Sequence, residues 1–140
     1  MEQLVKNQPD WDEPLNRNFE KFWNSQFTDN IIYLNGAQKD TSGGQLYWRC
    51  CALGETKLYH IEGYVQLPTV AAGQTIDVFN IPGITSTVRS AMITLKDGFR
   101  GDGIYLDKSS NPGTFCISNY SGQEQKSWKA KYCIWVICDN

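Results

Sequence analysis

The chain has 140 residues, of which 13% are aromatic and 20% are charged, and its formal net charge is −2. This length suffices for one domain with an ordinary core, and the composition excludes an intrinsically disordered chain. The Lys and Arg residues are scattered, which argues against nucleic acid as a partner, and no apolar run reaches the roughly 18 residues of a membrane span.

Residues 1–9 are polar and lack the apolar core of a secretion signal. We therefore expect the protein to be made in a cytoplasm and to stay there, unless it leaves inside a particle that is released by lysis.

The stretch 12–27 carries the one convincing helical pattern in the sequence. Asp12 is a suitable N-cap, and Glu13 and Pro14 suit a first helical turn. A helix of about 14 residues is marginal alone in water. Its apolar stripe therefore needs a partner, which is the chain's own core, two sister chains or a larger particle. We predict an assembly element with the contact residues Trp11, Leu15, Phe19, Phe22 and Trp23.

The residues that follow predict a change from helix to strands. Residues 31–34 are apolar and β-branched and indicate a first strand. Residues 35–44 are polar and rich in Gly, which predicts a flexible loop or linker. We place a boundary at about residue 40, between an N-terminal helix and linker (1–40) and a β-rich head domain (41–140).

Short strands separated by turn signals fill the rest of the chain. They are predicted at 45–53, 57–67, 75–81, 88–96, 104–107, 115–119 and 131–138. The last of them is apolar on both faces, so we expect it to lie centrally with cover on both sides. With 31–34 this makes about eight strands, which predicts a mainly β, antiparallel sandwich or jelly-roll-like head with one short N-terminal helix.

The segment 57–67 shows the clearest alternation of the predicted strands. One face is apolar, with Tyr59, Ile61, Val65 and Leu67. The opposite face is mixed and carries Leu58, His60, Glu62, Tyr64 and Gln66.

The sequence favours binding over catalysis. His60 is the single histidine, no GxSxG elbow accompanies it, and we expect it to be exposed or at an interface rather than catalytic. The segment 97–103 resembles a calcium loop only in composition, because it lacks the ligand order of an EF-hand. We therefore predict no enzyme, no metal and no cofactor.

The cysteines agree with an intracellular origin. They form no CxxC pair, and we interpret them as reduced, small core residues: Cys50, Cys51, Cys116, Cys133 and Cys138.

Aromatic residues with polar neighbours indicate a saccharide as ligand, because sugars offer C–H faces for stacking and hydroxyls for hydrogen bonds. The residues we select for such a site are Trp48, His60, Tyr64, Arg89, Arg100, Asp102 and Tyr105.

The segment Trp11-Asp12-Glu13-Pro14-Leu15-Asn16-Arg17-Asn18-Phe19 resembles the opening of phage tail, fibre and baseplate proteins of Gram-positive hosts. The layout of the second half is similar to the head domain of siphophage receptor-binding proteins, with a strand such as 58–67, a glycine hairpin such as 97–103 and a final strand such as 131–137.

This resemblance implies a homotrimer of β-sandwich heads in the virion. Its partners would be other tail or baseplate proteins and a host cell-surface polysaccharide, bound without covalent chemistry. The chain departs from the family in having no long neck between helix and head. A capsid or neck decoration without a host ligand and a cell-wall polysaccharide hydrolase therefore stay open as alternatives.

Overall fold

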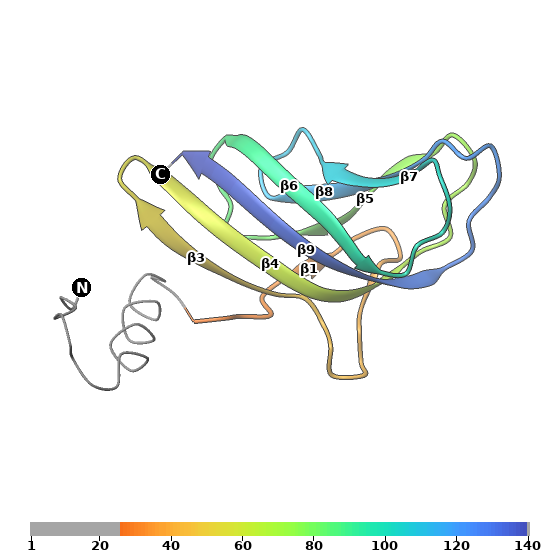
Figure 1. The fold of residues 1–140 in the computed structure, drawn as a ribbon, viewed down its shortest axis with the longest axis horizontal. Helices are drawn as coiled ribbons and strands as arrows, with labels where there is room; N and C mark the ends of the chain where they lie inside the picture. The colour runs from red at the N-terminus through yellow and green to blue at the C-terminus, as the bar shows by residue number, and fades with distance from the viewer. Residues whose placement is uncertain (1–25, 140) are drawn as a thin grey trace, which may run out of the picture.

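The computed structural model describes residues 26–139 (Figure 1). The residues predicted to form the assembly stripe, and the predicted helix up to residue 25, lie outside the described residues. The last two residues of the predicted helix, Gln26 and Phe27, are described and have no helical conformation.

The described residues form nine strands. Their bounds are β1 Ile32–Tyr33, β2 Gln38–Lys39, β3 Tyr47–Leu53, β4 Thr56–Leu67, β5 Thr75–Asn80, β6 Val88–Asp97, β7 Ile104–Lys108, β8 Thr114–Asn119 and β9 Trp128–Asp139. The eight predicted strands all occur, with ends shifted by up to three residues, and β2 is additional. The mainly β prediction is confirmed for this part of the chain.

The strands form two antiparallel sheets (Figure 1). One sheet has the order β1-β5-β8-β7, and the other has β2-β4-β9-β6 with β3 also paired to β4. Within the second sheet β4 and β9 pair along their whole lengths, from Thr56 opposite Asp139 to Leu67 opposite Trp128. The two longest strands therefore make the middle of this sheet.

Both sheets contribute to one core, as expected of a sandwich. The largest fully buried side chains come from β4, β9, β5 and β8 and from the segments between strands: Tyr59, Phe79, Phe115, Leu46, Ile61, Leu67, Ile81, Ile117, Ile134, Val65, Val70 and Val78. Burial of this apolar surface drives the two sheets together, at about 25 cal/mol for each Å² removed from water.

The predicted alternation of β4 is confirmed, because its apolar face is buried in this core. For β9, the described residues provide the predicted cover on one side only. The inward face of β9 is buried, but the opposite face is only half-buried and Ile137 is 42% exposed. Cys133, Trp135 and Ile137 thus lie on an outer sheet face that the described residues do not cover completely.

The segment 35–44, predicted as a loop, contains a strand. Gln38 and Lys39 of β2 pair with Gln66 and Val65 of β4. Residues upstream also pair, since β1 lies beside β5 in the other sheet. The described part of the N-terminal segment therefore belongs to both sheets, because their free edges supply backbone partners for it.

The described residues contain neither a disulfide nor a helix that could span a membrane. None of the five cysteines, all of which lie among them, forms a disulfide, and Cys51, Cys116 and Cys138 are buried as predicted. Across residues 26–139 no helical segment has the length and apolar character needed to cross a bilayer.

Candidate binding pocket and histidine cluster

One edge of β4 has two successive partners, and a pocket lies where they change. Over 56–62 this edge pairs with β3, and over 65–66 it pairs with β2. The seven residues 40–46 between β2 and β3 form a loop that projects below the sheet in Figure 1 and ends at Leu46, which is buried in the core.

Asp40 holds this loop in shape. Its carboxylate accepts hydrogen bonds from the Ser42 hydroxyl at 2.9 and 2.8 Å and from the Gly44 amide at 3.1 Å, and it pairs with Lys129 at 2.9 Å. The hydrogen bond from Lys129 is the main reason why the pKa of Asp40 falls to about 2. A charged, 8% exposed Asp40 thus connects the loop to β9.

Gly63 allows the loop to return close to β4. Its φ is +136°, and a Cβ placed there would lie 2.3 Å from the Gln45 carbonyl oxygen. The Gly44 carbonyl accepts a hydrogen bond of 2.7 Å from the Tyr64 amide. Gln45 and Tyr64 form an isolated parallel β-bridge. Only glycine fits such an approach of one backbone to another.

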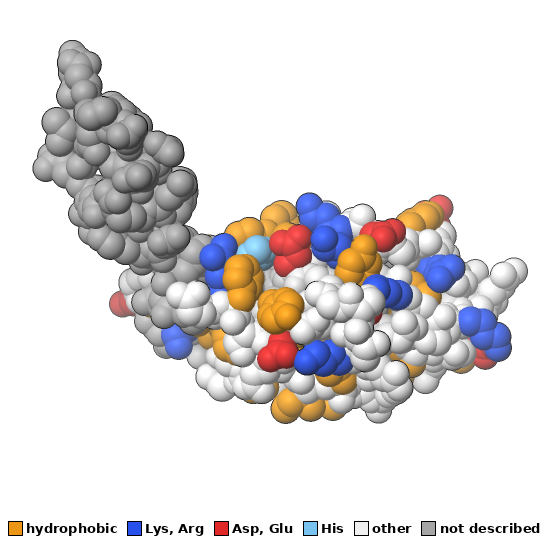
Figure 2. All heavy atoms as spheres, turned by 90° about the horizontal axis from the view of Figure 1, so that it is seen from below, with side chains coloured by type: hydrophobic (Ala, Val, Ile, Leu, Met, Phe, Trp, Pro, Cys, Tyr) orange, Lys and Arg blue, Asp and Glu red, His pale blue; other side chains and the backbone are white. Residues whose placement is uncertain are grey.

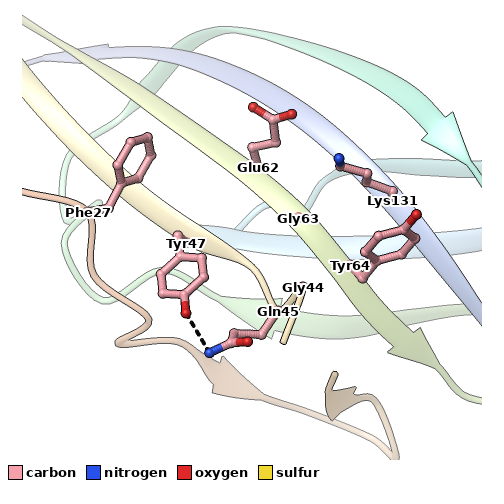
Figure 3. A pocket seen from close by; sticks show the side chains of 8 residues that line it. All are labelled: Phe27, Gly44, Gln45, Tyr47, Glu62, Gly63, Tyr64 and Lys131. Carbon is pink, nitrogen blue, oxygen red and sulfur yellow. Dashed lines mark hydrogen bonds between the residues drawn. The ribbon is translucent and has the colours of Figure 1, made fainter. Parts of the chain in front are cut away.

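A pocket of about 440 Å³ opens on the outer face beside this contact (Figure 3). Its lining consists of three aromatic side chains, three polar ones and two glycines: Phe27, Tyr47, Tyr64, Gln45, Glu62, Lys131, Gly44 and Gly63. Figure 3 shows Phe27 and Tyr47 on one side, Tyr64 on the other, and the ends of Glu62 and Lys131 between them along the upper rim. The same sheet face in Figure 2 has hydrophobic side chains next to acidic and basic ones.

Hydrogen bonds and cations fix the two tyrosines of the pocket. The Gln45 amide donates a hydrogen bond of 2.7 Å to the Tyr47 hydroxyl, and the Tyr64 hydroxyl donates one of 3.0 Å to Asp97. Lys129 and Lys131 lie 4.5 and 5.6 Å from the centre of the Tyr64 ring. These contacts hold the rings in place before any ligand arrives, which lowers the entropy cost of binding.

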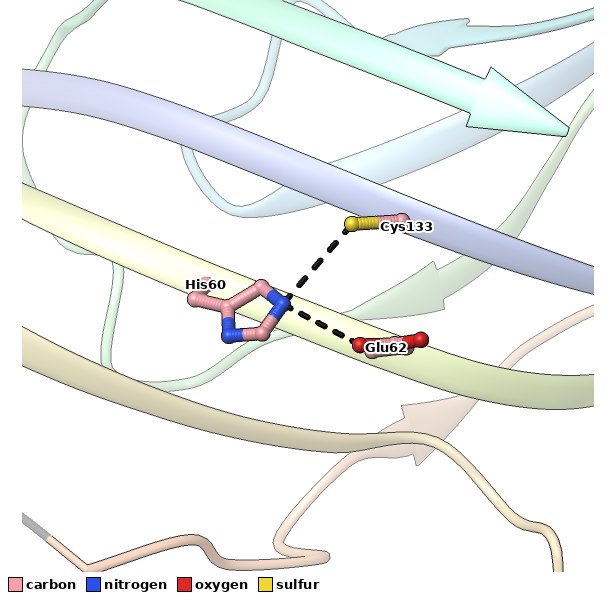
Figure 4. Close-up of side chains that lie close together, drawn as sticks. All are labelled: His60, Glu62 and Cys133. Atoms are coloured by element: carbon pink, nitrogen blue, oxygen red, sulfur yellow. Dashed lines mark hydrogen bonds and ion pairs between the residues drawn. The ribbon is translucent and has the colours of Figure 1, made fainter. Parts of the chain in front are cut away.

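His60, Glu62 and Cys133 form a cluster at the rim of the pocket (Figure 4). His60 Nε2 lies 3.3 Å from Glu62 Oε2 and 3.7 Å from Cys133 Sγ. His60 and Glu62 are two residues apart on one face of β4, and Cys133 is the partner of Glu62 on β9. The sheet register therefore brings the three side chains together.

Aromatic rings enclose the imidazole of this cluster. The Trp135 ring stacks on it with centroids 4.2 Å apart, and Phe27 meets it edge-on at 5.8 Å. His60 is consequently only 8% exposed, so it is not the exposed histidine that the sequence predicted as one of two possibilities, the other being an interface. Burial lowers the pKa of His60 and the Arg49 guanidinium adds to this, while Glu62 opposes it. The neutral imidazole is thereby favoured.

The cluster differs from a catalytic triad in one geometrical point. In a triad the nucleophile and the carboxylate contact different nitrogens of the imidazole, so that the acid orients the base. Here the carboxylate and the thiol both face Nε2 (Figure 4). Three ligand atoms that lie within 4.8 Å of one another have a spacing compatible with a cation site.

The residues selected from the sequence for a saccharide site lie in separate places. Tyr64 lines the pocket and His60 adjoins it through Glu62. Trp48 belongs to the packing between sheets, where its indole donates to the Asn30 carbonyl at 2.9 Å and its ring contacts Tyr59.

The other four selected residues lie away from the lining. Arg89 forms an ion pair with Asp139 at the start of β6. Arg100 and Asp102 are in the loop between β6 and β7, and Tyr105 is exposed on β7 with its ring 6.3 Å from Tyr120. The structure thus brings together only His60 and Tyr64 from the predicted set.

Sequence reasoning missed most of the lining. Tyr47 and Glu62 face each other across β3 and β4, and Lys131 is the partner of Tyr64 on β9. The alternation of residues 57–67 already placed Glu62 beside His60 and Tyr64. The pairing with β9, some seventy residues further along the chain, leaves no local signal.

Comparison of the chain with protein-family models, with curated proteins and with solved structures gives no match.

Proposed function

We propose that this chain is a phage virion protein that acts in host attachment, and that its pocket binds a cell-surface saccharide without covalent chemistry. The observation that carries the proposal is the lining of the pocket: three aromatic rings around Gln45, Glu62 and Lys131. The virion setting rests on the resemblance of residues 11–19 to the opening of phage tail and baseplate proteins.

The chemistry of the lining suits a sugar ring. Aromatic faces stack against the C–H faces of a pyranose, while amide, carboxylate and ammonium groups form hydrogen bonds with its hydroxyls. The pocket is open and of a size for one or two sugar units, so a single contact would be weak. Several copies on one particle would bind a cell wall with avidity.

The test is co-sedimentation of the full chain with purified cell walls from a panel of Gram-positive bacteria. Tyr47→Ala and Tyr64→Ala are each expected to weaken binding about thirtyfold, since truncating a central aromatic contact costs about 2 kcal/mol. Tyr105→Ala, which removes an exposed ring on the other sheet, is the matched control and should bind as the wild type does.

Three results would count against this proposal. If no wall in the panel binds, a capsid or neck decoration without host ligand is the better assignment. If Tyr105→Ala abolishes binding and the pocket variants do not, the ligand lies elsewhere on the head. Release of reducing sugars from the wall by the wild type would favour a hydrolase.

We also propose that the chain is a homotrimer joined by a helix that begins at about residue 12 and ends before Gln26. Its apolar stripe is too short to associate alone. Phe27, which follows it, lies against the head, with its ring 4.4 Å from the Arg49 guanidinium carbon. Light scattering during size-exclusion chromatography should give about three times the 15.9 kDa of one chain.

Replacing both Phe19 and Phe22 by Ser should release monomers or cause aggregation. The control Phe99→Ser makes the same chemical change at an exposed position in the loop after β6 and should remain trimeric. A wild-type chain that stays monomeric at micromolar concentration would disprove the trimer.

A further inference from the structure

Two of the ligand separations in the cluster of His60, Glu62 and Cys133, those from His60, are close to those of a tetrahedral metal site. Zinc lies about 2.0–2.2 Å from nitrogen and oxygen ligands and about 2.3 Å from sulfur, which separates its ligand atoms by roughly 3.3–3.6 Å. The observed separations from His60 Nε2 are 3.3 Å to Glu62 Oε2 and 3.7 Å to Cys133 Sγ, and the three ligand atoms all lie within 4.8 Å of one another.

We propose that this cluster binds a divalent transition metal ion of the zinc type through His60 Nε2, the Glu62 carboxylate and the Cys133 thiolate. The site does not depend on the proposed saccharide binding, because His60 and Cys133 are not part of the pocket lining.

The sheet holds the ligands in place before an ion binds. His60 and Glu62 project from one face of β4, and Cys133 lies directly opposite Glu62 on β9. The Trp135 ring stacks on the imidazole with an angle of 8° between the two ring planes, and this contact fixes the orientation of the imidazole. Only Glu62 has to move, and its side chain is 40% exposed, so rotation of the carboxylate toward the thiol meets little resistance.

The donor set selects among metals. A thiolate and an imidazole favour zinc, cobalt or copper over calcium and magnesium, which prefer oxygen ligands alone. Two anionic ligands neutralise the charge of a divalent ion. Arg49 pairs with His60 across β3 and β4, and the positive charge of its guanidinium opposes the ion. Lys131, which lines the pocket with Glu62, is a second positive charge on this face.

Three protein ligands leave a fourth tetrahedral position for water or another ligand. Because Glu62 also lines the pocket, that ion would lie at the rim of the pocket. This face of the sheet, which the sequence predicts to be free of metal, would then carry a metal ion beside the pocket.

Titration of the reduced, metal-free full chain with Co²⁺ alone tests the site, because cobalt bound by a thiolate gives a charge-transfer band in the near ultraviolet. The wild type should bind one Co²⁺ per chain with this band, and Zn²⁺ should displace it. Zn²⁺ should also raise the midpoint of thermal unfolding, as any ligand of the folded state does.

Substitutions assign the ligands. Cys133→Ser should remove the band, and His60→Gln and Glu62→Gln should each weaken metal binding by about tenfold to a hundredfold or more. Cys116→Ser, which changes a buried cysteine of the other sheet, is the matched control and should keep the band and the affinity.

The proposal is overturned if the wild type shows neither the band nor a Zn²⁺-dependent shift in unfolding, or if Cys116→Ser loses the band while Cys133→Ser keeps it. If Cys133→Ser does not fold, the metal affinity of Glu62→Gln becomes the test, because the Glu62 side chain is at the surface and its replacement should not prevent folding. Unchanged metal affinity in a folded Glu62→Gln would remove the carboxylate from the site.

Discussion

Gly63→Ala is expected to destabilise the protein by about 3 kcal/mol or more and to lower its midpoint of thermal unfolding by about 10 °C. The added Cβ would lie 2.3 Å from the Gln45 carbonyl oxygen and 2.9 Å from that of Gly44. Both contacts are with backbone, so no side-chain rotation relieves them. The backbone at φ +136° is also one that L-residues rarely adopt.

If the Gly63→Ala protein still folds, it should no longer bind the cell-wall saccharide. Gly44, Gln45 and Gly63 all line the pocket, and relief of the clash requires the loop 40–46 to move away from β4. Thermal unfolding followed by circular dichroism measures the first effect, and cell-wall co-sedimentation below the new midpoint measures the second.

Gly122→Ala is the matched control for backbone strain alone. Gly122 also has a positive φ, +80°, but a Cβ there would meet nothing within 4 Å. Its expected cost is about 1 kcal/mol. Equal losses of stability in the two variants would mean that the loop does not approach β4 as closely as the structure has it.

Local patterns predicted the strands well, because alternation and turn residues act over a few positions. The two faces of β4 could be read directly from the sequence. The glycine hairpin expected over 97–103 does not form, because β6 and β7 belong to different sheets. The strand β2 could not be read from the sequence, since Gln38 and Lys39 have low strand propensity and are held by backbone pairing with β4 and by the ion pair between Lys39 and Asp29.

The pocket and the histidine cluster lay beyond sequence reasoning for a different reason. Both depend on which residue of β9 faces which residue of β4, and a shift of one residue would move Lys131 and Cys133 to the other face of the sheet. That register is set by the fit of the core, a property of the whole fold. The sequence accordingly predicted no metal site, because Cys133 has no ligand neighbour along the chain.

Ile134→Ala is expected to destabilise the protein by about 2–5 kcal/mol, the usual cost of deleting a large buried aliphatic side chain. Ile134 is 0% exposed and lies at the middle of β9, between Ile61 of β4 and Ile93 of β6. The cavity would open where three strands meet the opposite sheet, and paired strands on both sides limit how far the backbone can collapse into it. Urea unfolding followed by tryptophan fluorescence measures the loss.

Ile137→Ala deletes the same atoms from the same strand and should cost only about 1 kcal/mol, because Ile137 is on the outer face and 42% exposed. Comparing the stability losses of Ile134→Ala and Ile137→Ala therefore shows which faces of β9 are covered in the assembled protein. A loss for Ile137→Ala as large as that for Ile134→Ala, and dependent on protein concentration, would mean that another chain buries the outer face. That result would restore the prediction of cover on both sides of this strand, with a partner subunit supplying the second side.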